Sequence, residues 1–214
     1  MGKKTQDEMV TILKPDQKCI IRDGKSHTKA FAPVQIGKQS MAELVNVDGG
    51  LIKGLPKDKW ICDNLLYTVE SESAIGKITW LIELKGTKNE KEVSHAADQI
   101  MDTIGYLSDQ MGYPGAQKYI EKRDYVFAAI VGAPDKTLPI LNDTKIKKLC
   151  RKLYGLSGKS NNINDMFCLL FYVRPNKNCT KMKIQKSKPP YEVICYSTKG
   201  GYITFPDDLV KMLC

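Results

Sequence analysis

The chain has 214 residues, of which 42% are hydrophobic, and this content fits one domain with a single good-sized core. No apolar run approaches the roughly 18 residues of a membrane-spanning helix, and 2 histidines argue against a histidine-rich zinc site or a mechanism with several histidines. The formal charge of +9 instead favours a polyanionic partner.

The cysteines and the N-terminal stretch indicate a reducing compartment. The 7 cysteines contain no Cys-x-x-Cys pair, and an odd total is a poor disulfide framework, so most should be reduced thiols and several should lie in the core. Residues 1–9 are polar and lack the apolar region of a signal peptide. We therefore expect a soluble cytoplasmic protein without membrane contacts.

The first quarter of the chain has the weakest pattern. Residues 9–13 and 19–22 could form short strands or the start of a helix. Residues 39–47 place Ser40 as a helix N-cap with Glu43 three residues later, the arrangement of a capping box, so we expect a short helix there. Glu43 either caps that helix or reaches a metal site.

The central pattern is an apolar strand at residues 78–86, which carries Glu83 and Lys85 on one face. A buried carboxylate and a buried ammonium must be paired or hold a metal, because burial of an unpaired charge is costly. Glu83 and the carbonyl of Leu84 are hard oxygen ligands suited to magnesium. Lys85 would contact the attacking water or the scissile phosphate.

A second carboxylate, Asp63, precedes an apolar run that can form the adjacent antiparallel strand. Residues 69–77 have the composition of a hairpin turn, and such a hairpin would bring Asp63 to the same edge as Glu83. Residues 51–55 would form an earlier strand. Core packing is the expected role of both tryptophans, Trp60 and Trp80. The 8% aromatic content gives no support for a platform that stacks single strands.

A helical pattern follows, in which apolar residues recur at helix spacing from Val93 to Met111 until Gly112 stops it. Gln99 lies beside the apolar stripe, on the flank that can face the lysine of the central strand. A glutamine at the boundary of the core without any function would show the same pattern, so a functional and a purely structural role of Gln99 both stay open. For His95 a solvent-facing or capping role is expected.

The second half of the chain alternates buried strands with helices. Residues 125–131 and 167–174 have the continuous apolar character of strands buried on both faces, and the first should run parallel to the central strand. Residues 143–154 predict an amphipathic helix that ends at Gly155. Residues 191–205 predict a hairpin, followed by a short helix.

This half is also strongly basic. Between Lys145 and Lys188 twelve Lys or Arg residues accompany one acid, Asp165. The segment is either a solvated lysine-rich face or a surface that binds a nucleic-acid backbone. The residues expected to contact nucleic acid are Lys145, Lys148, Arg151, Lys152, Arg174, Lys181 and Lys183.

The order of Asp63, then Glu83-Leu84-Lys85 on an apolar strand, then a helix carrying Gln99 resembles the PD-(D/E)xK nuclease superfamily. It looks most like a small bacterial and phage-type branch with Cys-Asp and Glu-Leu-Lys-Gly strands, although Cys62 stands where many members have proline. The resemblance implies an α/β, restriction-endonuclease-like fold, with a mixed central sheet flanked by helices in the order αβββαβ. A single domain would combine this core, about residues 39–135, with a basic extension, about 136–214, that carries the C-terminal hairpin.

The resemblance also implies roles for these residues. Asp63 and Glu83 would be metal ligands, Lys85 would position or activate water, and Gln99 would assist. The implied activity is that of a Mg2+-dependent endonuclease that cuts DNA, with Mn2+ as a substitute, in restriction or phage defence, and a homodimer would suit cutting of both strands. Three alternatives stay open: a non-catalytic module that binds nucleic acid or a partner, a structural Glu83–Lys85 ion pair, and RNA as the substrate.

Overall fold

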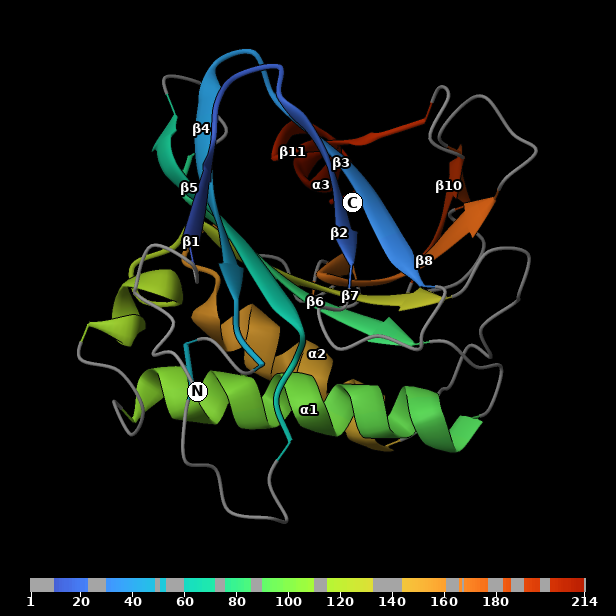
Figure 1. Ribbon diagram of the computed structural model, residues 1–214. Helices are drawn as coiled ribbons and strands as arrows, with labels where there is room; N and C mark the ends of the chain where they lie inside the picture. Colours follow the sequence, from blue (N-terminus) through green and yellow to red (C-terminus); the bar gives the residue numbers. More distant parts are fainter. Residues whose placement is uncertain are drawn as a thin grey trace, which may run out of the picture.

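Figure 1 shows the computed structural model, a mixed α/β fold in which one large sheet has helices on one face and a smaller sheet on the other. Within the described residues it contains eleven strands, three α-helices and one short 3₁₀ helix. The structure describes residues 10–22, 30–48, 51–52, 60–71, 76–85, 90–109, 115–132, 144–160, 166, 168–176, 183–185, 191–196 and 201–213.

The large sheet has eight strands and joins an antiparallel half to a parallel half. In spatial order the strands are β1 (Val10–Leu13), β4 (Ser40–Asn46), β5 (Asn64–Ser71), β6 (Ile78–Lys85), β7 (Tyr125–Gly132), β8 (Leu170–Asn176), β10 (Tyr191–Tyr196) and β9 (Lys183–Gln185). Strands β1, β4, β5 and β6 are antiparallel neighbours, whereas β6, β7, β8 and β10 run parallel, and β9 pairs antiparallel with β10. The C-terminal ends of the parallel strands therefore lie along one edge of the sheet.

Two helices cover one face of this sheet. Helix α1 (Glu90–Ser108) connects β6 to β7, and α2 (Thr144–Leu156) connects β7 to β8 (Figure 1). They pack against each other and against β6 and β7. The apolar stripe predicted for α1 is confirmed, because Val93, Ala96, Ala97, Ile100 and Ile104 are all 0% exposed.

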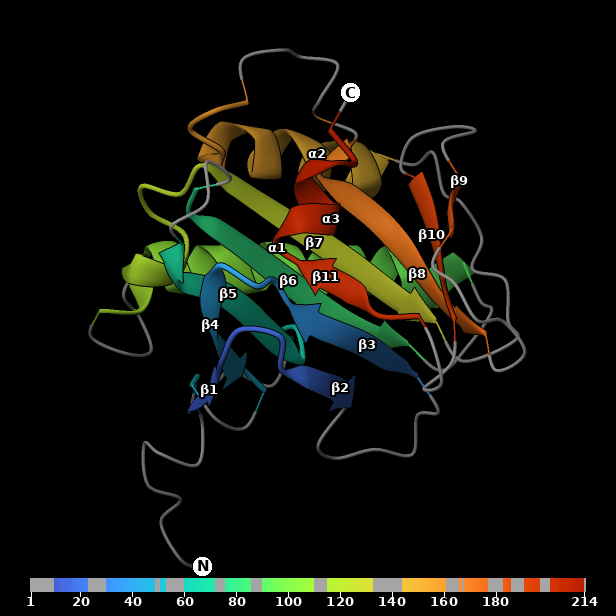
Figure 2. The same cartoon turned by 90° about the horizontal axis from the view of Figure 1, so that it is seen from above.

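A three-stranded sheet covers the opposite face (Figure 2). Its order is β11 (Ile203–Phe205), β3 (Phe31–Ile36) and β2 (Lys18–Arg22), and the short helix α3 (Asp207–Val210) packs on β11. The Trp80 ring of β6 stacks on Phe171 of β8 and Phe205 of β11, with ring centroids 5.6 and 6.3 Å away. The even-numbered side of β6 thus packs between the two sheets, and the odd-numbered side faces the helices.

The helix predicted at residues 39–47 is wrong, because this segment forms strand β4. β4 pairs with β1 on one side and with β5 on the other, so its backbone finds partners along both edges. A helix of this length would be marginal by itself. The three strands directly before α1 are β4, β5 and β6, and within the described residues no helix precedes them, so the first helix of the predicted order αβββαβ is absent there. Of the predicted strand 51–55 only residues 51 and 52 are described, where Ile52 bridges to Asp48.

The predicted C-terminal hairpin is also wrong. β10 pairs with β8 and β9 in the large sheet, whereas β11 pairs with β3 in the small sheet. The two strands do not form a hairpin because they pair in different sheets and not with each other. Helix α2 continues through Gly155 to Leu156, and β8 begins at Leu170, later than the predicted residue 167.

Other predictions are confirmed. β7 is a strand that runs parallel to β6, and α3 follows Pro206 as its N-cap. For residues 9–13 and 19–22, where strands and the start of a helix were both open, the structure shows the strands β1 and β2. Cys19, Cys62, Cys150 and Cys168 are free thiols, and the last three are buried. No helix in the described ranges is long and apolar enough to cross a membrane.

Candidate functional site

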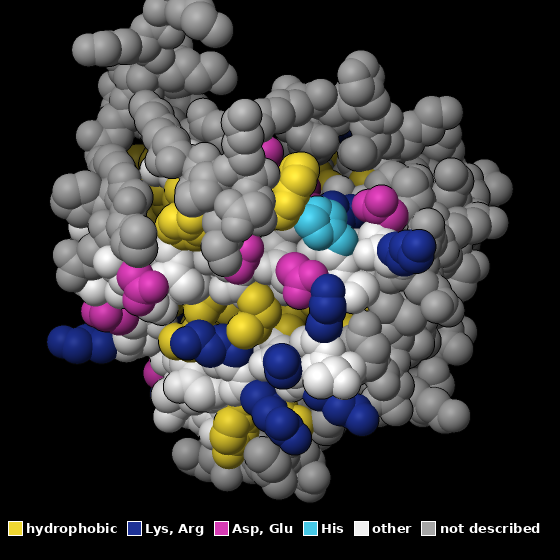
Figure 3. Space-filling model, turned by 90° about the horizontal axis from the view of Figure 1, so that it is seen from below, with side chains coloured by type: hydrophobic (Ala, Val, Ile, Leu, Met, Phe, Trp, Pro, Cys, Tyr) yellow, Lys and Arg dark blue, Asp and Glu magenta, His cyan; other side chains and the backbone are white. Residues whose placement is uncertain are grey.

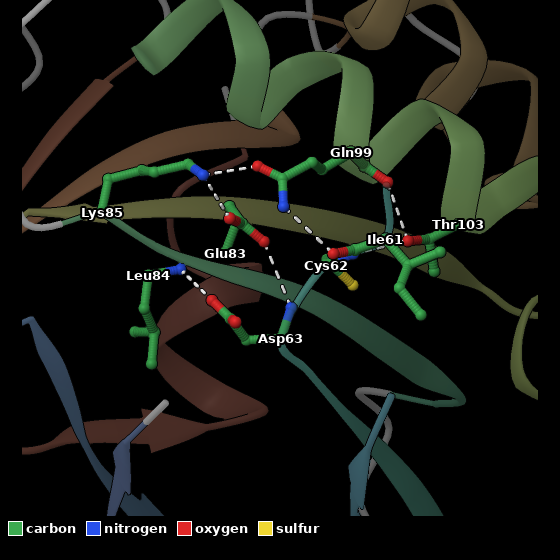
Figure 4. Close-up of polar contacts among 8 residues, drawn as sticks. All are labelled: Ile61, Cys62, Asp63, Glu83, Leu84, Lys85, Gln99 and Thr103. Atoms are coloured by element: carbon green, nitrogen blue, oxygen red, sulfur yellow. Dashed lines mark hydrogen bonds and ion pairs between the residues drawn. The ribbon is translucent and has the colours of Figure 1, made fainter. Parts of the chain in front are cut away.

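The β5–β6 pairing brings Asp63 and Glu83 together. Asn64 lies opposite Ile82, so Asp63, at the entry to β5, falls beside Glu83. The Asp63 N–H donates to Glu83 Oε2 at 3.2 Å, and the Leu84 N–H donates to Asp63 Oδ2 at 2.7 Å (Figure 4). The predicted meeting of the two carboxylates at one edge is therefore present.

Lys85 reaches the same cluster from the end of β6. Its Nζ lies 2.8 Å from Glu83 Oε1 and donates to Gln99 Oε1 of α1 at 2.5 Å (Figure 4). The Lys85 side chain is 12% exposed and that of Glu83 only 2%. The prediction that Gln99 faces Lys85 is confirmed, and α1 and β6 together hold the ammonium in place.

A hydrogen-bonded frame behind the cluster was missed from the sequence. Gln99 Nε2 donates to the Ile61 carbonyl at 3.1 Å, and the Cys62 N–H donates to Thr103 Oγ1 at 2.8 Å. The Thr103 hydroxyl in turn donates to the Gln99 carbonyl at 2.8 Å. These bonds join the chain just before Asp63 to one face of α1. The signal for Thr103 was its spacing of four residues from Gln99 on an otherwise apolar stripe.

The electrostatics of the cluster are dominated by its two carboxylates. Burial and, to a smaller extent, the neighbouring Asp63 raise the pKa of Glu83 from 4.5 to about 8, although Lys85 acts in the opposite direction. The same burial raises the pKa of the Cys62 thiol, so that this cysteine stays a neutral thiol. Lys85 therefore lowers the pKa of Glu83 by less than burial and Asp63 together raise it.

The donor set at this edge suits a hard divalent cation. Two carboxylates are supplied by Asp63 and Glu83, and carboxylate and carbonyl oxygens are the ligands that magnesium prefers. The N–H and C=O groups of one strand residue point to the same side, so the Leu84 carbonyl lies on the Asp63 side of β6. Within the described residues no cluster of three or more His, Cys, Asp or Glu side chains forms. Two carboxylates and a carbonyl would leave the remaining positions of a magnesium ion to water and phosphate.

The structure does not bring Glu43 to this cluster. Glu43 on β4 lies opposite Tyr67 on β5, which in turn lies opposite Thr79 on β6. Thr79 is four residues from Glu83, about 13 Å along the strand. The Glu43 carboxylate instead lies 3.5 Å from Nζ of Lys118, a residue of the 3₁₀ helix η2 (Ala116–Tyr119).

The basic residues predicted for nucleic-acid binding divide into two groups. The first group, Lys145, Lys148, Arg151 and Lys152, is exposed on α2. Together with Lys147, which was not among the predicted residues, it forms an exposed cationic side of α2, called the α2 basic face below. Within it Lys145 Nζ lies 2.5 Å from Asp98 Oδ2, an ion pair that joins α2 to α1. In the second group, Arg174 lies on β8 and Lys183 on β9 without a described side chain, and Lys181 is outside the described residues.

Comparison with known proteins adds no relative. No family model matches the chain, and neither a curated protein nor a solved structure matches it significantly. The functional argument therefore depends on the geometry of the site.

Proposed function

We propose that this protein is a Mg2+-dependent endonuclease that hydrolyses phosphodiester bonds in DNA, with Asp63, Glu83 and Lys85 as its catalytic centre. The observation that carries the proposal is the juxtaposition of two carboxylates and an ammonium on neighbouring antiparallel strands, at the end of β6. The order of three antiparallel strands, a helix and a parallel strand, from β4 to β7, supports it, because the nuclease superfamily shares this order.

A magnesium ion held by the Asp63 and Glu83 carboxylates and the Leu84 carbonyl would polarise the phosphate and favour ionisation of the attacking water. The residues of the chain supply orientation. Lys85 has three N–H donors, of which Glu83 and Gln99 engage two among the described contacts. The third would contact a phosphate oxygen or the attacking water. Water then bonds to phosphorus, one bond from phosphorus to an ester oxygen breaks, and that oxygen takes up a proton.

A purely structural ion pair explains the cluster less well. A Glu83–Lys85 pair alone would need neither the second carboxylate beside it nor the Gln99 amide that orients the ammonium. Replacing a buried ion pair by apolar residues is often neutral or stabilising, so the grouping of buried Glu83 with the partly buried Asp63 and Lys85 has no stability rationale by itself. Chemistry at this edge provides a rationale.

The α2 basic face supports a polyanionic substrate. Helix α2 follows β7, whose C-terminal end lies at the same sheet edge as Lys85. Figure 3 shows the helical side of the molecule, where Lys and Arg side chains gather. Cations on an exposed helix bind phosphates without reading sequence, so they would hold the duplex while the carboxylate edge acts on it.

The proposal is tested by incubating purified protein with supercoiled plasmid and with an end-labelled duplex, in magnesium, manganese or chelator. We expect cutting in either metal and none in chelator. Lys85→Ala should slow cutting by about 100- to 1,000-fold, the usual contribution of one group that stabilises the transition state. Lys211→Ala is the matched control, because this lysine also pairs with a carboxylate, Asp208, at 3.2 Å, but beside the small sheet.

Each of the other possible outcomes indicates a different function or a different active site. Protein that binds the duplex but cuts it in neither metal would replace the nuclease with a binding module. Protein that neither binds nor cuts DNA would shift the test to RNA. An active Lys85→Ala variant would remove the proposed centre while leaving the nuclease in place.

A further inference from the structure

Trp60 is exposed, contrary to the core role expected for it. Its exposed fraction is 53%, whereas that of Trp80 is 0%. Within the described residues only Ile12 and Val69 are other large hydrophobic side chains with comparable exposure. An exposed tryptophan presents a large apolar ring to water, so its position relative to the catalytic cluster is informative.

Trp60 lies next to the catalytic cluster. It precedes Ile61, whose carbonyl accepts the hydrogen bond from Gln99, the residue that holds Lys85. Its ring packs edge to face against His95, with ring centroids 5.2 Å apart and an interplanar angle of 78°. His95 is one turn before Gln99 on α1, about 6 Å along the helix axis.

The Trp60 side chain is 53% exposed beside this contact, which leaves ring surface available for a flat ligand. His95, which contacts the ring, lies on α1, the helix that also carries Gln99 and so holds the Lys85 ammonium. Every nucleobase has a flat aromatic face, and stacking on a protein aromatic ring is tolerant of base identity. In a paired duplex those faces are covered by neighbouring bases, so only an unpaired base can stack here.

The surroundings favour a nucleic acid over a protein partner. The Lys145–Asp98 ion pair joins the α2 basic face to α1 one turn beyond His95, so cations flank the aromatic pair on the helical side. Figure 3 shows a histidine side chain on the same face as the gathered Lys and Arg side chains. A phosphodiester strand offers both features at once, with phosphates for the lysines and a base for the ring.

We propose that Trp60, supported by His95, stacks an unpaired base next to the phosphate that is cut. Cleavage at this phosphate depends on the proposed nuclease activity, whereas stacking of the base on Trp60 does not. The preferred substrate would then be a strand with a frayed, flipped or single-stranded nucleotide at the site. Trp60 would be a specificity-determining residue and not one that takes part in the chemistry.

The test uses tryptophan fluorescence in chelator, so that no cutting occurs. The chain has 2 tryptophans, and the buried Trp80 is shielded, so Trp60 supplies the ligand-sensitive signal. We expect a short oligothymidylate to quench the fluorescence of the wild-type protein and to leave that of Trp60→Phe unchanged. A blunt duplex of the same length should quench far less.

Affinity measurements with the same two probes separate stacking from folding. Trp60→Ala should bind the oligothymidylate about 5- to 100-fold more weakly, the range expected for one lost base stack, and bind the duplex as wild type does. Trp60→Phe should recover part of the loss because it keeps a ring. Ile12→Ala is the matched control, because Ile12 is 58% exposed on the edge strand β1.

Quenching together with a loss confined to the single strand would support the proposal. Bound oligothymidylate without quenching, or an equal loss for both probes, would overturn it and make Trp60 a structural contact of α1. The nicking assay, run in parallel, keeps the two proposals apart. Cutting without quenching rejects only the stacking, quenching without cutting rejects only the nuclease, and the absence of binding and cutting rejects both.

Discussion

Two buried polar clusters lie at opposite ends of the same strand pair, β5 and β6. At one end Nη2 of Arg123 donates to the Thr68 and Ile78 carbonyls and to the Thr68 hydroxyl, at 2.8 to 3.1 Å. At the other end lie the Asp63 and Glu83 carboxylates with their lysine. Ile78 and Glu83 are five positions apart on β6, which separates the two ends by about 17 Å.

The two clusters differ in how their charge is compensated. Burial lowers the pKa of Arg123 to about 10, so the guanidinium stays charged at neutral pH among neutral oxygens and the Tyr67 ring, whose centroid is 4.8 Å away. Glu83 lies beside a second carboxylate, and burial together with Asp63 raises its pKa to about 8. Stability alone does not require two adjacent carboxylates, whereas the Arg123 guanidinium satisfies buried oxygens of both strands.

The largest expected effect is on activity at the carboxylate end. Asp63→Asn keeps an oxygen that can accept the Leu84 N–H but removes one charge of the pair. We expect plasmid nicking to slow by about 100- to 1,000-fold. The free energy of unfolding, measured in urea, should change by no more than about 1 kcal/mol.

Asp208→Asn is the matched control for this change. Asp208 Oδ2 also accepts a strand N–H, that of Thr204 at 2.7 Å, but it lies in α3 on the other side of the sheet. This variant should nick plasmid at nearly the wild-type rate. Equal losses in the two variants would show that the assay reports damage to the fold, and an active Asp63→Asn would contradict the site.

The opposite pattern is expected at the Arg123 end. Arg123→Met removes three hydrogen bonds and leaves buried oxygens without their donor, so the free energy of unfolding should fall by about 3 kcal/mol, roughly 1 for each bond. The folded fraction should keep its nicking activity. Arg22→Met is the control, because the guanidinium of this exposed arginine lies over the Phe31 ring, 5.5 Å from its centroid, and its loss should cost less than about 1 kcal/mol. Equal destabilisation of Arg123→Met and Arg22→Met would contradict the structural role of Arg123.

The free energy of unfolding should also depend on pH through Glu83, at the carboxylate end of the strand pair. The pKa of Glu83 is higher in the folded chain, about 8, than its ordinary 4.5, so the folded state holds a proton that the unfolded state loses. Wild-type stability in chelator should therefore fall, relative to Glu83→Gln, as pH rises from about 4.5 to about 8. Above that range the variant should be more stable by a few kcal/mol. Urea denaturation at pH 5 and 8.5 measures this difference, and a variant that becomes relatively less stable as pH rises would indicate a structural ion pair with Lys85.

The smallest expected effect concerns the α2 basic face. Arg151→Gln should weaken duplex binding several-fold and reduce the slope of log affinity against log salt by about one, the signature of one lost phosphate contact. Lys14→Gln removes an equally exposed charge from the chain between β1 and β2 and should leave the slope unchanged. Fluorescence anisotropy over a range of salt concentrations gives both slopes. Identical slopes in the two variants would mean that the duplex does not contact α2.

The cluster of Asp63, Glu83 and Lys85 could be predicted because its signals are local. Alternation of apolar and polar residues placed Glu83 and Lys85 on one side of β6, and a turn between two apolar runs placed Asp63 opposite. Helix periodicity placed Gln99 on the side of α1 that faces the strand. Each of these inferences needs only the spacing within one element or one hairpin.

The rest could not be predicted because it depends on contacts between distant segments. The Ser-x-x-Glu pattern at Ser40 is compatible with a helix cap, and only pairing with β1 and β5 makes the segment a strand. β11 finds its partner in β3, far away in the chain, which no local pattern reveals. The exposure of Trp60 has the same cause, since an apolar ring near a strand is indistinguishable from a core residue until the fold is known.

We propose that Asp63 and Glu83 form a metal centre. Electron paramagnetic resonance of Mn2+ bound to the protein tests this proposal most directly. We predict a site in the wild-type protein whose affinity falls by about 100-fold or more in Asp63→Asn and in Glu83→Gln, since even outer partners of metal ligands contribute about 10- to 100-fold. The Asp208→Asn control should bind as wild type does. Equal Mn2+ affinity in wild type and in both carboxylate variants would contradict the account.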